Sequence, residues 1–292
     1  MSEKIDLNGT DGTENGPGGG NITPEMFLDF IKPLMKEPDR EIAEALKTIA
    51  GLYKKKDLFQ EGEKLYRQAL VFLKKELGSE HPELARTIYN FAEYLLSTGD
   101  PGEAEDLYLD AINILEKTPG QEEDLLARVL YGQGQMYRWM FRLEEAEEPL
   151  LRSLEIRERV LGKYHPDIAR TLCELGELYR RSGRSYEAWN PLKRALSIRE
   201  KVLGPDHFDV AQALDYLGTL AVSRGLYAEA KAQYDKANKI INKIGPDHPT
   251  WTLPWITFIL SIIFTGKKRP RQRKLSPIPR RIPGPCKFHP TR

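Results

Sequence analysis

A period of 42 residues constrains the fold of this chain more than any other feature of its sequence. Five columns of similar residues keep that register without an insertion, which predicts an array of repeated units that contact their neighbours in turn. The columns are Ala43, Ala85, Ala127, Ala169 and Ala211; Glu61, Glu103, Glu145, Glu187 and Glu229; Gly62, Ala104, Ala146, Ala188 and Ala230; Tyr66, Tyr108, Leu150, Leu192 and Tyr234; and Ala69, Ala111, Ser153, Ala195 and Ala237.

Each unit contains two stretches of helical periodicity, separated by a turn with a glycine such as Gly99, Gly183 or Gly225. A further small column in the first helix (Ala50, Ala92, Gly134, Gly176 and Gly218) allows the second helix to approach closely, at the Gly62 column. We expect the bulky Tyr66 column to fill the space toward the next repeat. Because one hairpin cannot bury both of its faces, the units are predicted to stack into an all-α solenoid.

The small-residue columns and the Tyr/Phe positions resemble the tetratricopeptide repeat. The junctions "ELGSEHPELA" (76–85), "VLGKYHPDIA" (160–169) and "VLGPDHFDVA" (202–211) resemble more specifically the repeats of kinesin light chain and its relatives, such as nephrocystin-3. The resemblance covers about residues 42–250. It implies a right-handed superhelical solenoid of five helix-turn-helix repeats and a role in binding, without naming a partner.

The chain divides into five parts on this basis. An N-terminal cap helix is expected because Thr23, Pro24 and Glu25 form a helix start before an apolar stripe. The expected parts are a disordered Gly-rich leader (1–22), the cap helix and turn (23–41), five repeats (42–83, 84–125, 126–167, 168–209 and 210–250), an apolar segment (251–265), and a disordered basic Pro-rich tail (266–292).

The resemblance also implies that the first helix of each hairpin lines a concave groove. At the implied groove positions, nine basic residues stand against five acidic ones, and Arg86, Arg128 and Arg170 occupy one offset in three successive repeats. Arginine binds carboxylates through two parallel hydrogen bonds, and aromatic side chains pack at low entropic cost. We therefore expect an extended acidic peptide with at least one bulky apolar residue. The expected groove residues are Lys47, Arg86, Tyr89, Asn90, Arg128, Tyr131, Arg138, Trp139, Arg170, Arg181 and Tyr216.

Two alternatives to this groove stay open at this point. The first alternative explains the arginines as a solvated face paired with neighbouring glutamates. The carboxylate clamp of co-chaperone tetratricopeptide proteins is matched by Lys47, Asn90 and conservatively Arg128, but fails at Gly51 and Gly132. Kinesin-light-chain repeats carry an Asn pair of which only Asn90 is present, so their cargo specificity does not transfer.

The motifs of an enzyme, a metal site or a bound cofactor are missing from the sequence. No nucleophile–His–acid set, P-loop or HExxH pattern is present, and the two cysteines have no paired spacing. The histidines at 81, 165, 207 and 248 lie in equivalent loops of different repeats, so they cannot converge on one ion. We expect a non-enzymatic interaction scaffold or cargo adaptor in the cytoplasm, without metal or cofactor, linked to kinesin or the cytoskeleton by resemblance only.

The formal net charge of +1 conceals a strong asymmetry, because residues 266–292 hold ten basic residues and no acid, which leaves −9 for the rest. Such a tail would bind polyanions and direct a regulatory scaffold to the nucleus or to a membrane surface. Ser276 precedes a proline, as in proline-directed phosphorylation sites. The residues that resemble a nuclear-import signal are Lys267, Lys268, Arg269, Arg271, Arg273 and Lys274.

The apolar segment at 251–265 has three interpretations. It is too short to cross a bilayer as a helix, and it is apolar on every face. It could pack on repeat five and on a partner or twin chain, associate with a membrane surface together with the basic tail, or mark an alternative splice or reading-frame end.

Overall fold

The computed structural model describes residues 59–120 and 122–244, and every regular element in those ranges is an α-helix. The leader, the cap helix, the first helix of repeat one, the apolar segment and the basic tail lie outside the described residues. The helices are α3 (Phe59–Leu77), α4 (Pro82–Thr98), α5 (Pro101–Glu116), α6 (Glu123–Trp139), α7 (Leu143–Leu161), α8 (Pro166–Arg181), α9 (Ser185–Leu203), α10 (Phe208–Ser223) and α11 (Tyr227–Ile244).

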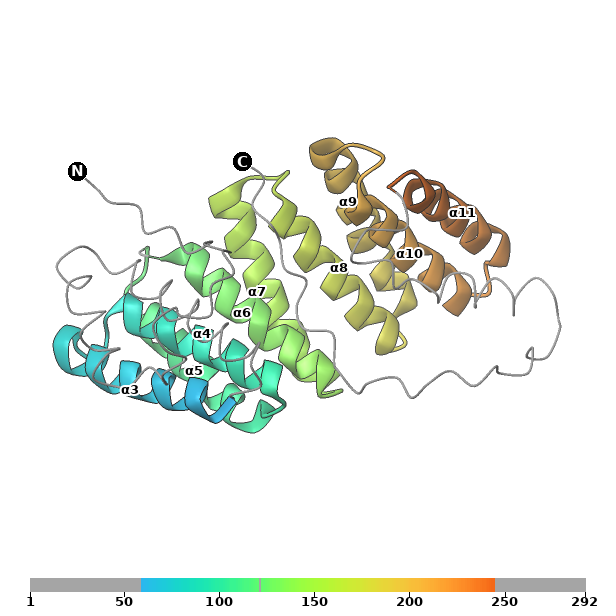
Figure 1. The fold of residues 1–292 in the computed structure, drawn as a ribbon. Coiled ribbons are helices and arrows are strands. Elements are labelled where there is room, and N and C mark those ends of the chain that lie inside the picture. The colour runs from blue at the N-terminus through green and yellow to red at the C-terminus, as the bar shows by residue number, and fades with distance from the viewer. Residues whose placement is uncertain (1–58, 121, 245–292) are drawn as a thin grey trace, which may run out of the picture.

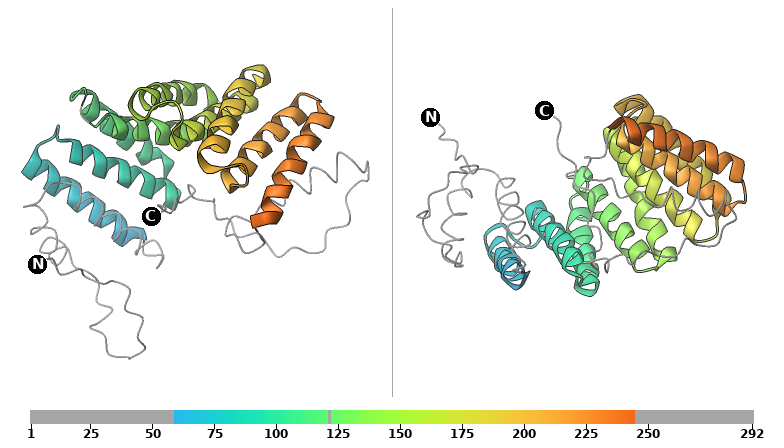
Figure 2. Two further views of the ribbon diagram at one scale, coloured as in Figure 1. Left: turned by 90° about the horizontal axis from the view of Figure 1, so that it is seen from above. Right: turned by 45° about the vertical axis from the view of Figure 1, so that its right-hand side comes forward.

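These helices form a stack of hairpins in chain order. α4 packs with α5, α6 with α7, α8 with α9 and α10 with α11, and each second helix also contacts the first helix of the following hairpin. Figure 1 shows the hairpins following one another along the molecule, and Figure 2 shows that the stack curves into an arc. The predicted all-α solenoid is confirmed for this part of the chain.

Glycines end the first helices of three hairpins, as the sequence predicts. Gly99, Gly183 and Gly225 have φ values of 98°, 76° and 73°, which only glycine adopts without a steric penalty. After Gly183, the N–H of Arg184 donates to the carbonyl of Tyr179 at 2.8 Å, which closes the helix end. The chain can therefore reverse within a few residues and begin the second helix.

Close packing inside each hairpin depends on a missing side chain opposite a large one. A Cβ on Gly176 would lie 2.4 Å from Cγ of Leu192, and one on Gly134 would lie 2.5 Å from Cγ of Leu150. The bulky column therefore packs over the glycine of its own hairpin. The same column also fills space toward the next repeat, as expected. The Tyr66 ring lies 5.1 Å from the Phe91 ring and 5.3 Å from the Tyr94 ring of α4, and Tyr108 reaches α6 of the following hairpin.

Ion pairs connect neighbouring hairpins at the turns. The Arg184 guanidinium lies 2.5 Å from Glu147 of the preceding hairpin and 2.5 Å from Glu187 of its own, and it covers the Tyr179 ring at 4.5 Å. Arg142 repeats this arrangement one period earlier, with Glu105 and Glu145. A single exposed pair stabilises a protein by about 0–1 kcal/mol, but here one guanidinium joins two carboxylates and a ring.

The junction histidines begin the first helices. His81, His165 and His207 are N-cap residues, and Nδ1 of each accepts a hydrogen bond from the backbone N–H two residues later, at 3.2, 3.2 and 3.1 Å. This bond satisfies one of the donors that a helix start leaves without a partner. The position of these histidines in separate loops is thus explained by helix capping.

We expect His165→Ala to lower the free energy of unfolding by about 1 kcal/mol, because the N–H of Asp167 loses its acceptor. His165→Asn should recover most of that loss, since asparagine caps through its side-chain oxygen. Urea unfolding followed by circular dichroism measures both variants. If asparagine were no better than alanine, the capping role of His165 would be refuted.

Candidate peptide-binding face

The first helices of the hairpins form one continuous strip, because α4 contacts α6, α6 contacts α8, and α8 contacts α10. We call its expected groove positions in repeats two to five the first-helix face. Lys47, the basic residues at 267–274 and Ser276 lie outside the described residues. The first-helix face consists of Arg86, Tyr89, Asn90, Glu93, Leu96 and Ser97 on α4; Arg128, Tyr131, Gly132, Gln135, Arg138 and Trp139 on α6; Arg170, Cys173, Glu174, Glu177, Arg180 and Arg181 on and at the end of α8; and Gln212, Asp215, Tyr216, Thr219, Val222 and Ser223 on α10.

Of the three arginines that occupy one offset in successive repeats, Arg86 and Arg170 are paired with acids near the start of a first helix. The Arg86 guanidinium lies 2.8 Å from Glu83 and 2.6 Å from Glu122, and its side chain is 19% exposed. Arg170 lies 3.2 Å from Asp167. Their positive charges are balanced within the protein, as the alternative of an ion-paired face requires.

Arg128 differs from the other two. Within residues 59–120 and 122–244, no carboxylate lies within ion-pair distance of its guanidinium, which instead lies 5.6 Å from the centre of the Tyr89 ring. Tyr89 and Arg128 are both half-buried, and they come from neighbouring repeats. The ring therefore supports a guanidinium that keeps its capacity to bind a carboxylate in the described structure.

Asn90 lies beside Tyr89 on α4 and is also half-buried. Its amide has no hydrogen-bond partner among the side chains and backbone groups of the described residues. An amide with both a donor and an acceptor free can pair with the backbone of an extended peptide. Arg128 and Tyr89 thus form a polar and aromatic contact between repeats two and three, and Asn90 is the next residue of α4.

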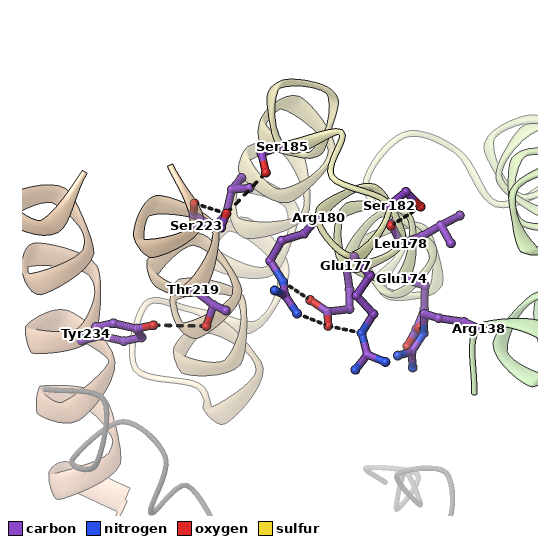
Figure 3. A network of polar contacts seen from close by, with 12 residues as sticks. Arg138, Glu174, Glu177, Leu178, Arg180, Ser182, Ser185, Thr219, Ser223 and Tyr234 are labelled. Carbon is purple, nitrogen blue, oxygen red and sulfur yellow. Dashed lines mark hydrogen bonds and ion pairs between the residues drawn. The ribbon is translucent and has the colours of Figure 1, made fainter. Parts of the chain in front are cut away.

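Charges farther along the strip are again paired internally, as Figure 3 shows. Arg138 donates to Glu174 at 2.7 Å. Glu177 accepts from both Arg180 and Arg181, at 2.7 and 2.6 Å. Burial alone would raise the pKa of Glu177, but the hydrogen bonds from the two arginines outweigh it and hold the pKa below its usual range.

The aromatic residues of the first-helix face differ in exposure. Trp139 and Tyr216 are half-buried, whereas Tyr131 is 8% exposed and packs in the core. The guanidinium of Arg157 of α7 lies 4.7 Å from the centre of the Tyr131 ring. Tyr131 therefore offers little surface to a ligand. Cys173, at the same offset one repeat later, is likewise buried, and burial raises the pKa of its thiol to about 11.

Two buried arginines, Arg157 and Arg199, are not among the residues expected from the sequence. Arg157 is 2% exposed and donates to the carbonyl of Asp167 at 3.0 Å and to Thr171 Oγ1 at 2.6 Å. Arg199, one period later, donates to the carbonyl of Asp209 at 2.7 Å. The sequence does contain an indication of their role, because the column that holds Leu73 and Leu115 changes to arginine at these positions.

Asp215 lies on α10, at the end of the strip, and like Arg128 it has no oppositely charged partner in the described residues. It is half-buried, and it has no hydrogen bond or ion pair to any residue in the described ranges. Burial, with a smaller contribution from the charge of Glu177, raises the pKa of Asp215 to about 6. The carboxylate is therefore destabilised in the folded chain.

We expect Asp215→Asn to increase the free energy of unfolding at pH 7.5 by about 1 kcal/mol, a value reduced because the side chain is partly exposed. A folded-state pKa above the unfolded value means that this group lowers stability as pH rises from about 4 to about 6. The gain should therefore shrink toward pH 4. Urea unfolding at several pH values measures it, with exposed Asp106→Asn as the control. A gain that does not change with pH would contradict the assignment.

The described residues contain no group of three side chains placed to hold a metal ion. None of the described helices is long and apolar enough to span a membrane. The chemistry present on the strip is that of noncovalent recognition: guanidinium groups, carboxylates, amides and rings.

A family model described as "Tetratricopeptide repeat" matches residues 41–117 and 125–201, which is more than half of the chain. The chain belongs to the tetratricopeptide repeat family. Tetratricopeptide folds are in general non-enzymatic scaffolds that bind other proteins. No curated protein sequence is significantly similar to this chain.

Solved structures with the same tetratricopeptide fold include kinesin-light-chain-like proteins. BtubC (BKLC) from P. vanneervenii is 26% identical, with a TM-score of 0.67 over 76% of this chain and 87% of that one. A putative kinesin light chain of Podosopora anserina with nearly identical TPR-like repeats is 23% identical, with a TM-score of 0.63 over 72% of this chain and 100% of that one. The apo form of RapI is 17% identical, with a TM-score of 0.64 over 82% of this chain and 64% of that one.

Proposed function

We propose that this protein is a non-enzymatic scaffold or cargo adaptor that binds an extended acidic peptide with a bulky apolar residue on the first-helix face. The observation that carries the proposal is Arg128, a half-buried arginine on an aromatic ring with no carboxylate partner in the described structure. The positive charges of Arg86 and Arg170 are paired with acidic side chains of the protein itself. Arg128 is therefore the residue that would make the site prefer acidic peptides.

The residues around Arg128 support an extended ligand. A guanidinium can take a carboxylate through two parallel hydrogen bonds, and the neighbouring Asn90 amide can pair with the peptide backbone. Trp139, at the end of the same helix as Arg128, offers a half-buried ring for an apolar side chain. Acid, backbone and apolar contacts thus follow one another across the same strip.

The paired arginines do not oppose such a ligand. The pair of Arg170 with Asp167 is partly exposed, and such pairs contribute about 0–1 kcal/mol, so a ligand carboxylate can join or replace Asp167 at little cost. Glu83, the partner of Arg86, is buried, so a ligand carboxylate would join that pair more readily than replace it. The contribution of these two arginines should be smaller than that of Arg128.

A co-chaperone-type receptor for acidic C-terminal peptides is the second candidate. It is favoured by the same two groups, since Asn90 and Arg128 match two positions of the carboxylate clamp and neither is paired in the described residues. A peptide with an amidated C-terminus distinguishes the candidates. Unchanged binding after amidation would exclude a terminal-carboxylate clamp.

The remaining proposals rest on sequence alone. These are a cytoplasmic location, a kinesin or cytoskeletal link, nuclear or membrane-surface association through the tail, and self-association through 251–265. Fusion of residues 266–292 to a fluorescent protein tests the nuclear proposal, which fails if the fusion stays in the cytosol.

We expect Arg128→Glu to weaken binding of short acidic peptides with one central Leu, Phe or Trp by at least about tenfold, because a charge-assisted contact becomes a repulsion. Fluorescence anisotropy with the full chain, at low and high salt, measures the affinity. Arg152→Glu is the matched control, because Arg152 is an arginine of the second helix α7 that pairs with Glu116. Equal affinity of both variants, without salt dependence, would refute the peptide site.

A further inference from the structure

The turn between α6 and α7 contains a phenylalanine where three other repeats have glycine. Phe141 has a φ of 60°, in the left-handed region, and stands one period from Gly99 and Gly183. The backbone pattern is the same: the N–H of Arg142 donates to the carbonyl of Tyr137 at 2.9 Å, as Arg184 does to Tyr179 at 2.8 Å. A bulky residue is strained in this conformation, and glycine is not.

The strain is not compensated by burial. The Phe141 side chain is 75% exposed, although aromatic residues stabilise a fold mainly by being buried. At the equivalent positions Gly99, Gly183 and Gly225, an added Cβ would meet nothing within 4 Å. The turn therefore directs a side chain into open space, and packing within the described part of the fold gives no reason for an aromatic one. Strained residues are concentrated at binding sites and active sites.

Phe141 also lies next to the first-helix face. The Arg181 guanidinium is 5.9 Å from the centre of its ring, and Trp139 precedes it by two residues. Arg181 shares the carboxylate of Glu177 with Arg180, and its side chain is 34% exposed. An exposed ring beside a partly exposed arginine is complementary to an apolar side chain next to an acid.

We propose that Phe141 is a specificity-determining contact that packs against the bulky apolar residue of the bound acidic peptide, beside Arg181. This inference rests on the proposed peptide-binding function and deepens it. Phe141 is retained in a strained turn because it binds, so its removal should change stability and affinity in opposite directions.

The test compares Phe141→Gly and Phe141→Asn with the unaltered full chain. Both replacements tolerate a positive φ, and we expect Tm to rise by about 1–3 °C. The probes are short acidic peptides with Leu, Phe or Trp at the central position, followed by fluorescence anisotropy. We expect both variants to bind these peptides about tenfold more weakly, and to bind a matched peptide with central Ala as the unaltered chain does.

The matched control is Gly183→Phe, which creates the same strained aromatic turn one repeat later. We expect it to lower Tm and leave the affinities unchanged. Loss of affinity in Arg128→Glu but not in the Phe141 variants would overturn this inference and leave the proposed function standing. A fall in Tm for both Phe141 variants would also overturn it, because the ring would then support the fold. If the unaltered chain bound none of the peptides, both proposals would fall.

Discussion

The close approach of the two helices in each hairpin is the constraint on which the rest of the structure depends. At Gly176 and Gly134 the absence of a side chain allows Leu192 and Leu150 to pack directly against the opposing helix. Because this contact recurs at one period, the hairpins have the same shape and stack in the same way. The stacking in turn brings α4, α6, α8 and α10 into one strip, and so the first-helix face follows from the packing of small residues against large ones.

Charge on this protein is used mainly for joining repeats. Arg142 and Arg184 hold successive hairpins together, and Glu177 is shared by two arginines at the end of α8. A tally of charges therefore overstates the positive potential of the strip. Among the charged groups of the strip, Arg128 and Asp215 have no oppositely charged side chain within ion-pair distance in the described structure.

The sequence predicts the helices, their order and their turns, because each depends on local pattern: the small columns, the turn glycines and the 42-residue period. It does not predict which side chains on the strip are free. Arg86 pairs with Glu122, 36 residues away, and such a contact depends on how one hairpin is placed against the next. Tyr131 is buried and lies against Arg157 of a different helix, and its offset within the repeat does not predict that burial. The change from Leu115 to Arg157 within one column is the sequence feature that indicates a different environment at this position.

The histidine caps have a consequence for the whole array. In each of them the imidazole accepts a backbone hydrogen bond through Nδ1. The stability of a repeat protein is close to a sum over its units and their interfaces. The small contribution of one cap therefore recurs at α4, α8 and α10, and the stabilisation of the helix starts is distributed along the array instead of being concentrated at a single junction.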